Sequence, residues 1–105
     1  MRDGRSSRRR PLPKVEDLGR RESEDLQVSR YYASTGNHIA AYMRAKDAVR
    51  VVPGDSAAHF ALAEAAAALK KTDEAVAEYR ASLQLAPQGD DAAKARRALA
   101  KITPP

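Results

Sequence analysis

The chain carries one layout twice, at an interval of 34 residues. Each copy has a helix-forming stretch, a short polar turn, a second helix-forming stretch and a closing proline, which is Pro53 in the first copy and Pro87 in the second. A fixed period of this length is typical of repeat proteins, in which each unit buries its apolar face against its neighbours. This feature constrains the fold more than any other, because it favours an array of helix pairs.

The composition supports an all-α fold. Alanine, the best helix former, is frequent from position 57 onward, and the chain has only one Phe, four Tyr and no Trp. Strand formers of the β-branched and aromatic kind are therefore sparse. At 105 residues the chain has room for one domain with a modest core.

Turn and cap residues divide the repeats into five expected helices. Gly36 is suited to a left-handed position after the first helix, and Asp55 or Ser56 to the N-cap of the third. The expected helices cover residues 22–34, 38–52, 56–69, a stretch that Thr72 caps and Pro87 ends, and a last helix that Asp90 or Asp91 caps and that reaches Ile102.

The residue types exclude most catalytic and metal chemistry. Without cysteine there is no disulfide, no thiolate metal site and no Cys nucleophile. His38 and His59 stand 21 residues apart with no carboxylate at ligand spacing, so a metal site is not expected. Phosphate-binding loops, Gly-rich dinucleotide loops and serine nucleophile motifs are also missing. We therefore expect neither enzymatic activity nor a cofactor.

The net charge of +5 comes from the N-terminus. Residues 1–14 contain six basic groups and one acidic group, whereas the other 91 residues contain 13 of each. We expect residues 1–21 to form a disordered basic tail and a linker, interrupted by Gly19. The tail is interpreted either as a solubilising or misplaced N-terminal segment, or as an arm that binds nucleic acid or an anionic membrane surface.

No apolar run approaches the roughly 20 residues of a membrane span. As written, the chain is expected to be soluble and cytoplasmic. A membrane-associated or envelope location is expected only if the true N-terminus lies upstream.

The spacing of small and apolar residues in both repeats resembles the pattern of the tetratricopeptide repeat (TPR) family. That pattern reads W-x2-L-G-x2-Y, then A-x3-F, then P. The positions of this pattern align in the first repeat with Asp25, Val28, Ser29, Tyr32, Ala41, Ala45 and Pro53, and in the second with His59, Leu62, Ala63, Ala66, Ala75, Tyr79 and Pro87. Asp25 and His59 depart from it, because they stand where the family has Trp. An unrelated bundle of four or five helices is the alternative.

The resemblance implies a right-handed α-solenoid over residues 22–103. Its repeats would cover residues 22–55 and 56–89, with a capping helix at 90–102. In such a solenoid the first helices line a concave groove, and small residues such as Ala41, Ala63 and Ala75 let the helices approach closely. The groove positions implied to bind a partner are Leu26, Arg30, Ser34, Phe60 and Glu64. Leu26 and Phe60 would either grip an apolar side chain or pack against neighbouring parts of the chain.

The implied function is a non-enzymatic scaffold that binds a peptide or protein partner, of the kind found in bacterial proteins. Two repeats are fewer than the three that such arrays need. We therefore expect a homodimer, docking on a larger assembly, or a fragment of a longer array. The alternative function is binding of nucleic acid or an anionic membrane surface through the Arg-rich arm.

Overall fold

A computed structural model describes residues 15–103, with side chains from Leu18 onward. Five α-helices make up most of this part, and it contains no strand. The all-α prediction is therefore confirmed for the described residues. The helices are α2 (Val15–Ser34), α3 (His38–Val51), α4 (Ser56–Ala68), α5 (Thr72–Leu85) and α6 (Ala92–Ile102).

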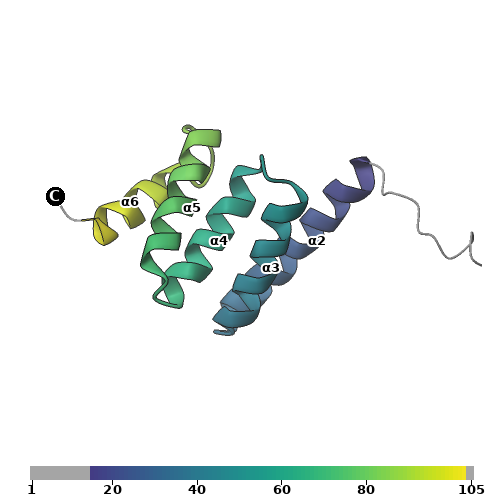
Figure 1. Ribbon diagram of the computed structural model, residues 1–105, viewed down its shortest axis with the longest axis horizontal. Helices are drawn as coiled ribbons and strands as arrows, with labels where there is room; N and C mark the ends of the chain where they lie inside the picture. Colours follow the sequence, from purple (N-terminus) through teal and green to yellow (C-terminus); the bar gives the residue numbers. More distant parts are fainter. Residues whose placement is uncertain (1–14, 104–105) are drawn as a thin grey trace, which may run out of the picture.

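The helices lie side by side in chain order, with α2 and α6 at the two ends of the row (Figure 1). Each packs on the next helix along the chain, and α2 also contacts α4. Short connections reverse the chain direction at each step, which is the arrangement that short loops between packed helices favour. Within the described part, no helix has both the length and the apolar character that crossing a bilayer demands.

The two turns inside the helix pairs have the same backbone geometry. Gly36 and Lys70, 34 residues apart, both adopt left-handed conformations, with φ of 84° and 64°. In both turns the amide of the next residue donates to the carbonyl five residues back, at 2.8 and 2.9 Å. This is the Schellman pattern, which satisfies carbonyls at a helix C-terminus. The left-handed conformation predicted for Gly36 is confirmed.

The two connections between helix pairs are also alike. The amides of Asp55 and Gly89 donate to the carbonyls three residues back, at 3.2 and 3.1 Å, and both are followed by an equivalent bond at the start of the next helix. Asp55 caps α4 as predicted, because its side chain accepts from the Ala57 amide at 3.0 Å. The start of α6 therefore repeats the backbone hydrogen bonding of the start of α4.

The core is built mainly of alanine. Ala41, Ala63 and Ala75, the small residues expected at close helix approaches, have no exposed surface. One buried cluster surrounds Tyr79 at the α4–α5–α6 end, and α6 contributes Ala95 to it. Small side chains leave little volume between helices, so the helix backbones come close together.

Several helix ends differ from the prediction. Helix α2 begins at Val15, so residues 15–21 are helical where a linker was expected. Gly19 lies exposed inside this helix, because one glycine costs only about 1 kcal/mol and good helix formers follow it. Thr72 is the first residue of α5 rather than its cap, and α3 and α4 each end one residue early. Asp91 is the N-cap of α6, without a side-chain hydrogen bond. The expected tail over residues 1–14 lies outside the described residues.

Candidate functional site

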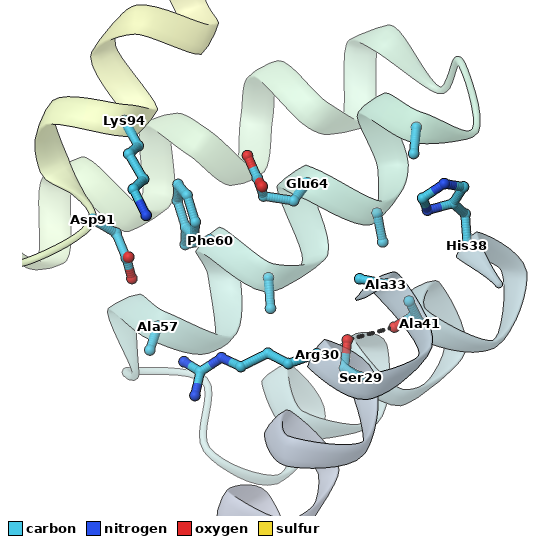
Figure 2. Close-up of a pocket in the computed structure, with 13 residues that line it drawn as sticks. Ser29, Arg30, Ala33, His38, Ala41, Ala57, Phe60, Glu64, Asp91 and Lys94 are labelled. Carbon is cyan, nitrogen blue, oxygen red and sulfur yellow. Dashed lines mark hydrogen bonds between the residues drawn. The ribbon is translucent and has the colours of Figure 1, made fainter. Parts of the chain in front are cut away.

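A groove of about 510 Å³ is bordered mainly by α2, α4 and the start of α6, and α3 contributes His38 and Ala41 to its lining (Figure 2). Its lining is mostly small side chains. Four of them lie on α4 at helical spacings, so they form one stripe along that helix. The small lining residues on α2 and α4 are Ala33, Ala57, Ala61, Ala65 and Ala68. Because these side chains end at Cβ, they leave open space where longer residues would meet.

The side of the groove that α2 forms is held against α3 by a hydrogen bond. Ser29 is buried, and its hydroxyl donates to the Ala41 carbonyl at 2.8 Å (Figure 2). This bond joins α2 to α3 from within the lining. Satisfying a buried hydroxyl in this way fixes the relative position of the two helices.

Phe60 is the one phenylalanine among the lining residues, which include no Tyr or Trp. It is half-buried, and its ring meets the Tyr79 ring edge to face, with centroids 5.9 Å apart. Tyr79 is buried and donates its hydroxyl to the Glu64 carboxylate at 2.8 Å. Burial, and then the hydrogen bond to Glu64, raise the pKa of Tyr79. The contacts orient both Phe60 and Glu64 from behind the groove.

Charged side chains enter the groove from two different helices. Figure 2 shows Arg30 extending from α2 toward Ala57, and Lys94 pointing from α6 into the space beside Phe60. Asp91 lies at the same end as Lys94. The groove therefore combines an apolar floor with the ring of Phe60 and charges of both signs.

Three of the five predicted partner-binding residues meet here, namely Arg30, Phe60 and Glu64. Leu26 does not, because it is only 6% exposed and packs in the core against Ala48 and Ala58. Ser34 also lies outside the lining, and its hydroxyl donates to the Tyr31 carbonyl at the end of α2.

Sequence reasoning missed the contributions of His38, Asp91 and Lys94. The 34-residue period contains a signal for two of them. Counting back one period places Lys94 at the position of Phe60 and Asp91 at the position of Ala57. Extending the repeat into the last helix would have identified both as groove residues.

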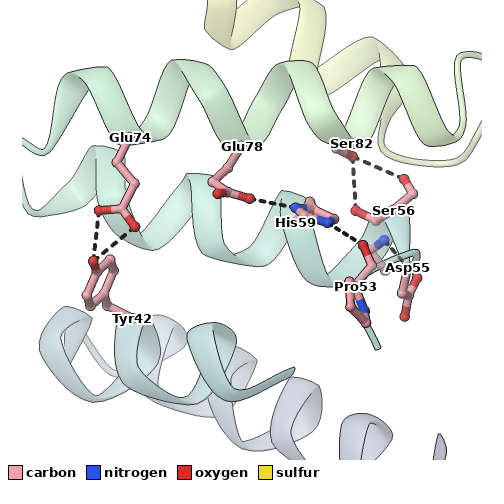
Figure 3. Close-up of polar contacts among 9 residues, drawn as sticks. Tyr42, Pro53, Asp55, Ser56, His59, Glu74, Glu78 and Ser82 are labelled. Carbon is pink, nitrogen blue, oxygen red and sulfur yellow. Dashed lines mark hydrogen bonds and ion pairs between the residues drawn. The ribbon is translucent and has the colours of Figure 1, made fainter. Parts of the chain in front are cut away.

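Polar pairs at equivalent positions join the two helices of each unit. Asp25 on α2 forms an ion pair with Arg44 on α3 at 3.3 Å. One period later, His59 contacts the Glu78 carboxylate at 2.6 Å, and its other ring nitrogen meets the Pro53 carbonyl (Figure 3). Both ring nitrogens of His59 thus lie within hydrogen-bonding distance of an oxygen atom, one on α5 and one at the end of the first helix pair.

Contacts between units hold the pairs in register. The Tyr42 hydroxyl of α3 donates to the Glu74 carboxylate of α5, at 2.8 and 3.0 Å to its two oxygens (Figure 3). This contact links the first helix pair to the second.

The described residues contain no cluster of three side chains able to hold a metal ion. Compared with known proteins, the chain matches no protein-family model, and none of the curated proteins matches it.

Proposed function

We propose that the protein is a non-enzymatic interaction module, a right-handed α-solenoid of the tetratricopeptide type, which binds a peptide segment of a partner protein in the α2–α4–α6 groove. The groove itself carries the proposal: its alanine floor, the ring of Phe60 and its charges of both signs offer a surface for a mixed polar and apolar chain. Its volume lies in the range of ligand-binding clefts.

The recurrence of the turns supports the tetratricopeptide assignment. Left-handed residues recur at an interval of 34, and so do the bonds at the connections between units. The departures from the family pattern also have a structural explanation. Where the family has Trp, Asp25 and His59 each form a polar pair with the second helix of their unit. These pairs provide the contact between helices that an aromatic side chain would otherwise make.

The proposal is tested by filling the groove without disturbing the core. Ala33 lines the groove and is exposed, whereas Ala77 is exposed on α5 and lies outside the lining. Peptides enriched from a random display library on the wild-type protein would be titrated by fluorescence anisotropy. We expect Ala33→Gln to weaken their binding about tenfold, because the longer side chain occupies the floor, and Ala77→Gln to leave it unchanged.

Two outcomes contradict the proposal. One is that no peptide is enriched by the wild-type protein. The other is that the enriched peptides bind the Ala33→Gln variant as tightly as the wild type. The alternative function, binding of nucleic acid or an anionic surface through the basic arm, rests on residues 1–14, which lie outside the described part. It predicts that deleting those residues abolishes binding while Ala33→Gln does not.

A further inference from the structure

Helix α6 carries the strongest local charge of the described part. Residues 92–103 contain four basic residues and no acidic one, whereas residues 15–91 contain nine basic and 13 acidic residues. All four basic side chains of α6 are exposed. The end of the helix row is therefore cationic, and the body beside it has an acidic excess.

Three of these cations form a stripe that has no partner in the described residues. Lys94, Arg97 and Lys101 follow one another at helical spacings, over roughly 10 Å of helix. None of them forms an ion pair within residues 18–103. The fourth, Arg96, donates to the Pro87 carbonyl and so has an internal contact. On the other side of the helix, Ala92 and Ala95 are buried.

The position of Lys94 is not explained by the stability of the helix. It lies in the first turn of α6, where the helix dipole disfavours a cation, whereas Lys101 in the last turn is favourably placed. Lys94 also belongs to the groove lining, beside Phe60 (Figure 2). The cationic stripe thus begins inside the groove and runs away from it along α6.

We propose that the basic stripe of α6 binds a run of acidic residues in the partner, directly next to the segment that lies in the groove. Opposite charge is the argument for this occupant, since three exposed cations in line match a short series of Asp or Glu side chains. Lys94 joins the two sites, because it is part of both. The inference rests on the proposed function and names the class of peptide recognised.

An acidic polypeptide fits this surface better than a membrane or a nucleic acid does. The large apolar side chains exposed in the described part are Tyr31, Ile39, Met43 and Leu85, and none of them lies on α6. The helix therefore offers no ring for base stacking and no wedge for a bilayer. A stripe that continues from a concave groove follows a chain and does not match a flat membrane surface.

The test uses peptides enriched on the groove, extended at either end by Glu-Glu-Glu-Glu or by Gln-Gln-Gln-Gln. We expect the Glu extension at one end to raise affinity about tenfold over the Gln extension at low salt, and the gain to shrink as salt is added. The variant Arg97→Glu/Lys101→Glu should lose the gain. The control variant Arg20→Glu/Arg21→Glu replaces two exposed cations on α2, so its net charge equals that of the α6 variant. This control should retain the gain in affinity.

Equal affinity for the Glu and Gln extensions overturns the inference, and so does an equal loss in the α2 control. A labelled octaglutamate peptide separates this test from that of the groove. If octaglutamate binds the wild type and not the Arg97→Glu/Lys101→Glu variant, the stripe binds acidic peptides. This result would hold even if no peptide were enriched on the groove. If an eight-nucleotide thymidine strand or a phosphatidylglycerol vesicle binds α6 more tightly than octaglutamate, the choice of occupant is wrong.

Discussion

At the scale of single residues, Glu22 is the least satisfied group in the described part. It is only 7% exposed, and its Oε2 atom has no hydrogen-bond partner. The pKa of Glu22 is raised from an ordinary value of 4.5 to about 7; burial is the largest cause, the neighbouring Asp55 contributes to the rise, and Arg30 opposes it. Two carboxyl groups thus meet where α2 contacts the start of α4, and they share that place best when one is protonated.

The free energy of unfolding is therefore expected to fall as pH rises from 4.5 to about 7. The folded state holds the Glu22 proton more tightly than the unfolded state, so the contribution is fully present below pH 4.5 and is lost as pH rises to about 7. The loss amounts to about 2–3 kcal/mol of unfolding free energy. Urea unfolding at pH 5 and pH 7.5 should show it in the wild type.

The variant Glu22→Gln should flatten the pH dependence of the unfolding free energy, because the amide stays neutral at both pH values. Glu24→Gln alters an exposed neighbour and should leave it as in the wild type. A Glu22→Gln protein with an undiminished difference between the two pH values would show that another group is responsible.

At the scale of elements, the same turn is made by glycine in one unit and by lysine in the other. Gly36 adopts φ 84° without steric penalty, whereas Lys70 holds φ 64° with a Cβ in place. The left-handed conformation of Lys70 is therefore imposed by the packing of α4 against α5. Residue preference and tertiary packing agree in the first turn and conflict in the second.

Exchanging the two residue types should move stability in opposite directions. Lys70→Gly should stabilise the protein by about 0.5–1 kcal/mol, and Gly36→Lys should destabilise it by about 1 kcal/mol. Thermal unfolding followed by circular dichroism measures both. If Lys70→Gly lowers the midpoint, the greater freedom of glycine in the unfolded chain outweighs the relief of strain in the turn.

At the scale of the molecule, α6 lies at the end of the helix row and packs on α5. Its Ala95 enters the cluster around Tyr79, and Leu99 and Ile102 pack against that cluster from outside. The apolar face of α5 is covered on this side by α6. The helix is thus part of the fold, and its cationic side remains available to a partner.

Removing residues 90–105 should expose this cluster and destabilise the chain by several kcal/mol, about what the loss of a few buried apolar side chains costs. A chain that ends at Thr103 keeps α6 whole and should unfold like the wild type. Chemical denaturation of both measures the difference. Equal midpoints would mean that α6 does not contribute to the core.

The candidate site could be predicted from the sequence only in part. Arg30, Phe60 and Glu64 could be assigned to the groove from their positions on two expected helices, because helical spacing determines which residues share a face. Leu26 occupies the position of Phe60 one period earlier, yet it is buried, because Ala48 and Ala58 close over it at the interface with α4. Periodicity defines a face of a helix, and the neighbouring helices decide whether that face stays open.

The sequence by itself determined the helical class, the 34-residue period, the close approaches at alanine and the glycine turn, because each depends on local propensity or on spacing along the chain. The tertiary structure alone decided three other features: the meeting of Glu22 with Asp55, the burial of Leu26, and the entry of Lys94 into the groove. These depend on contacts between residues more than twenty positions apart, and a pattern within one helix does not contain them.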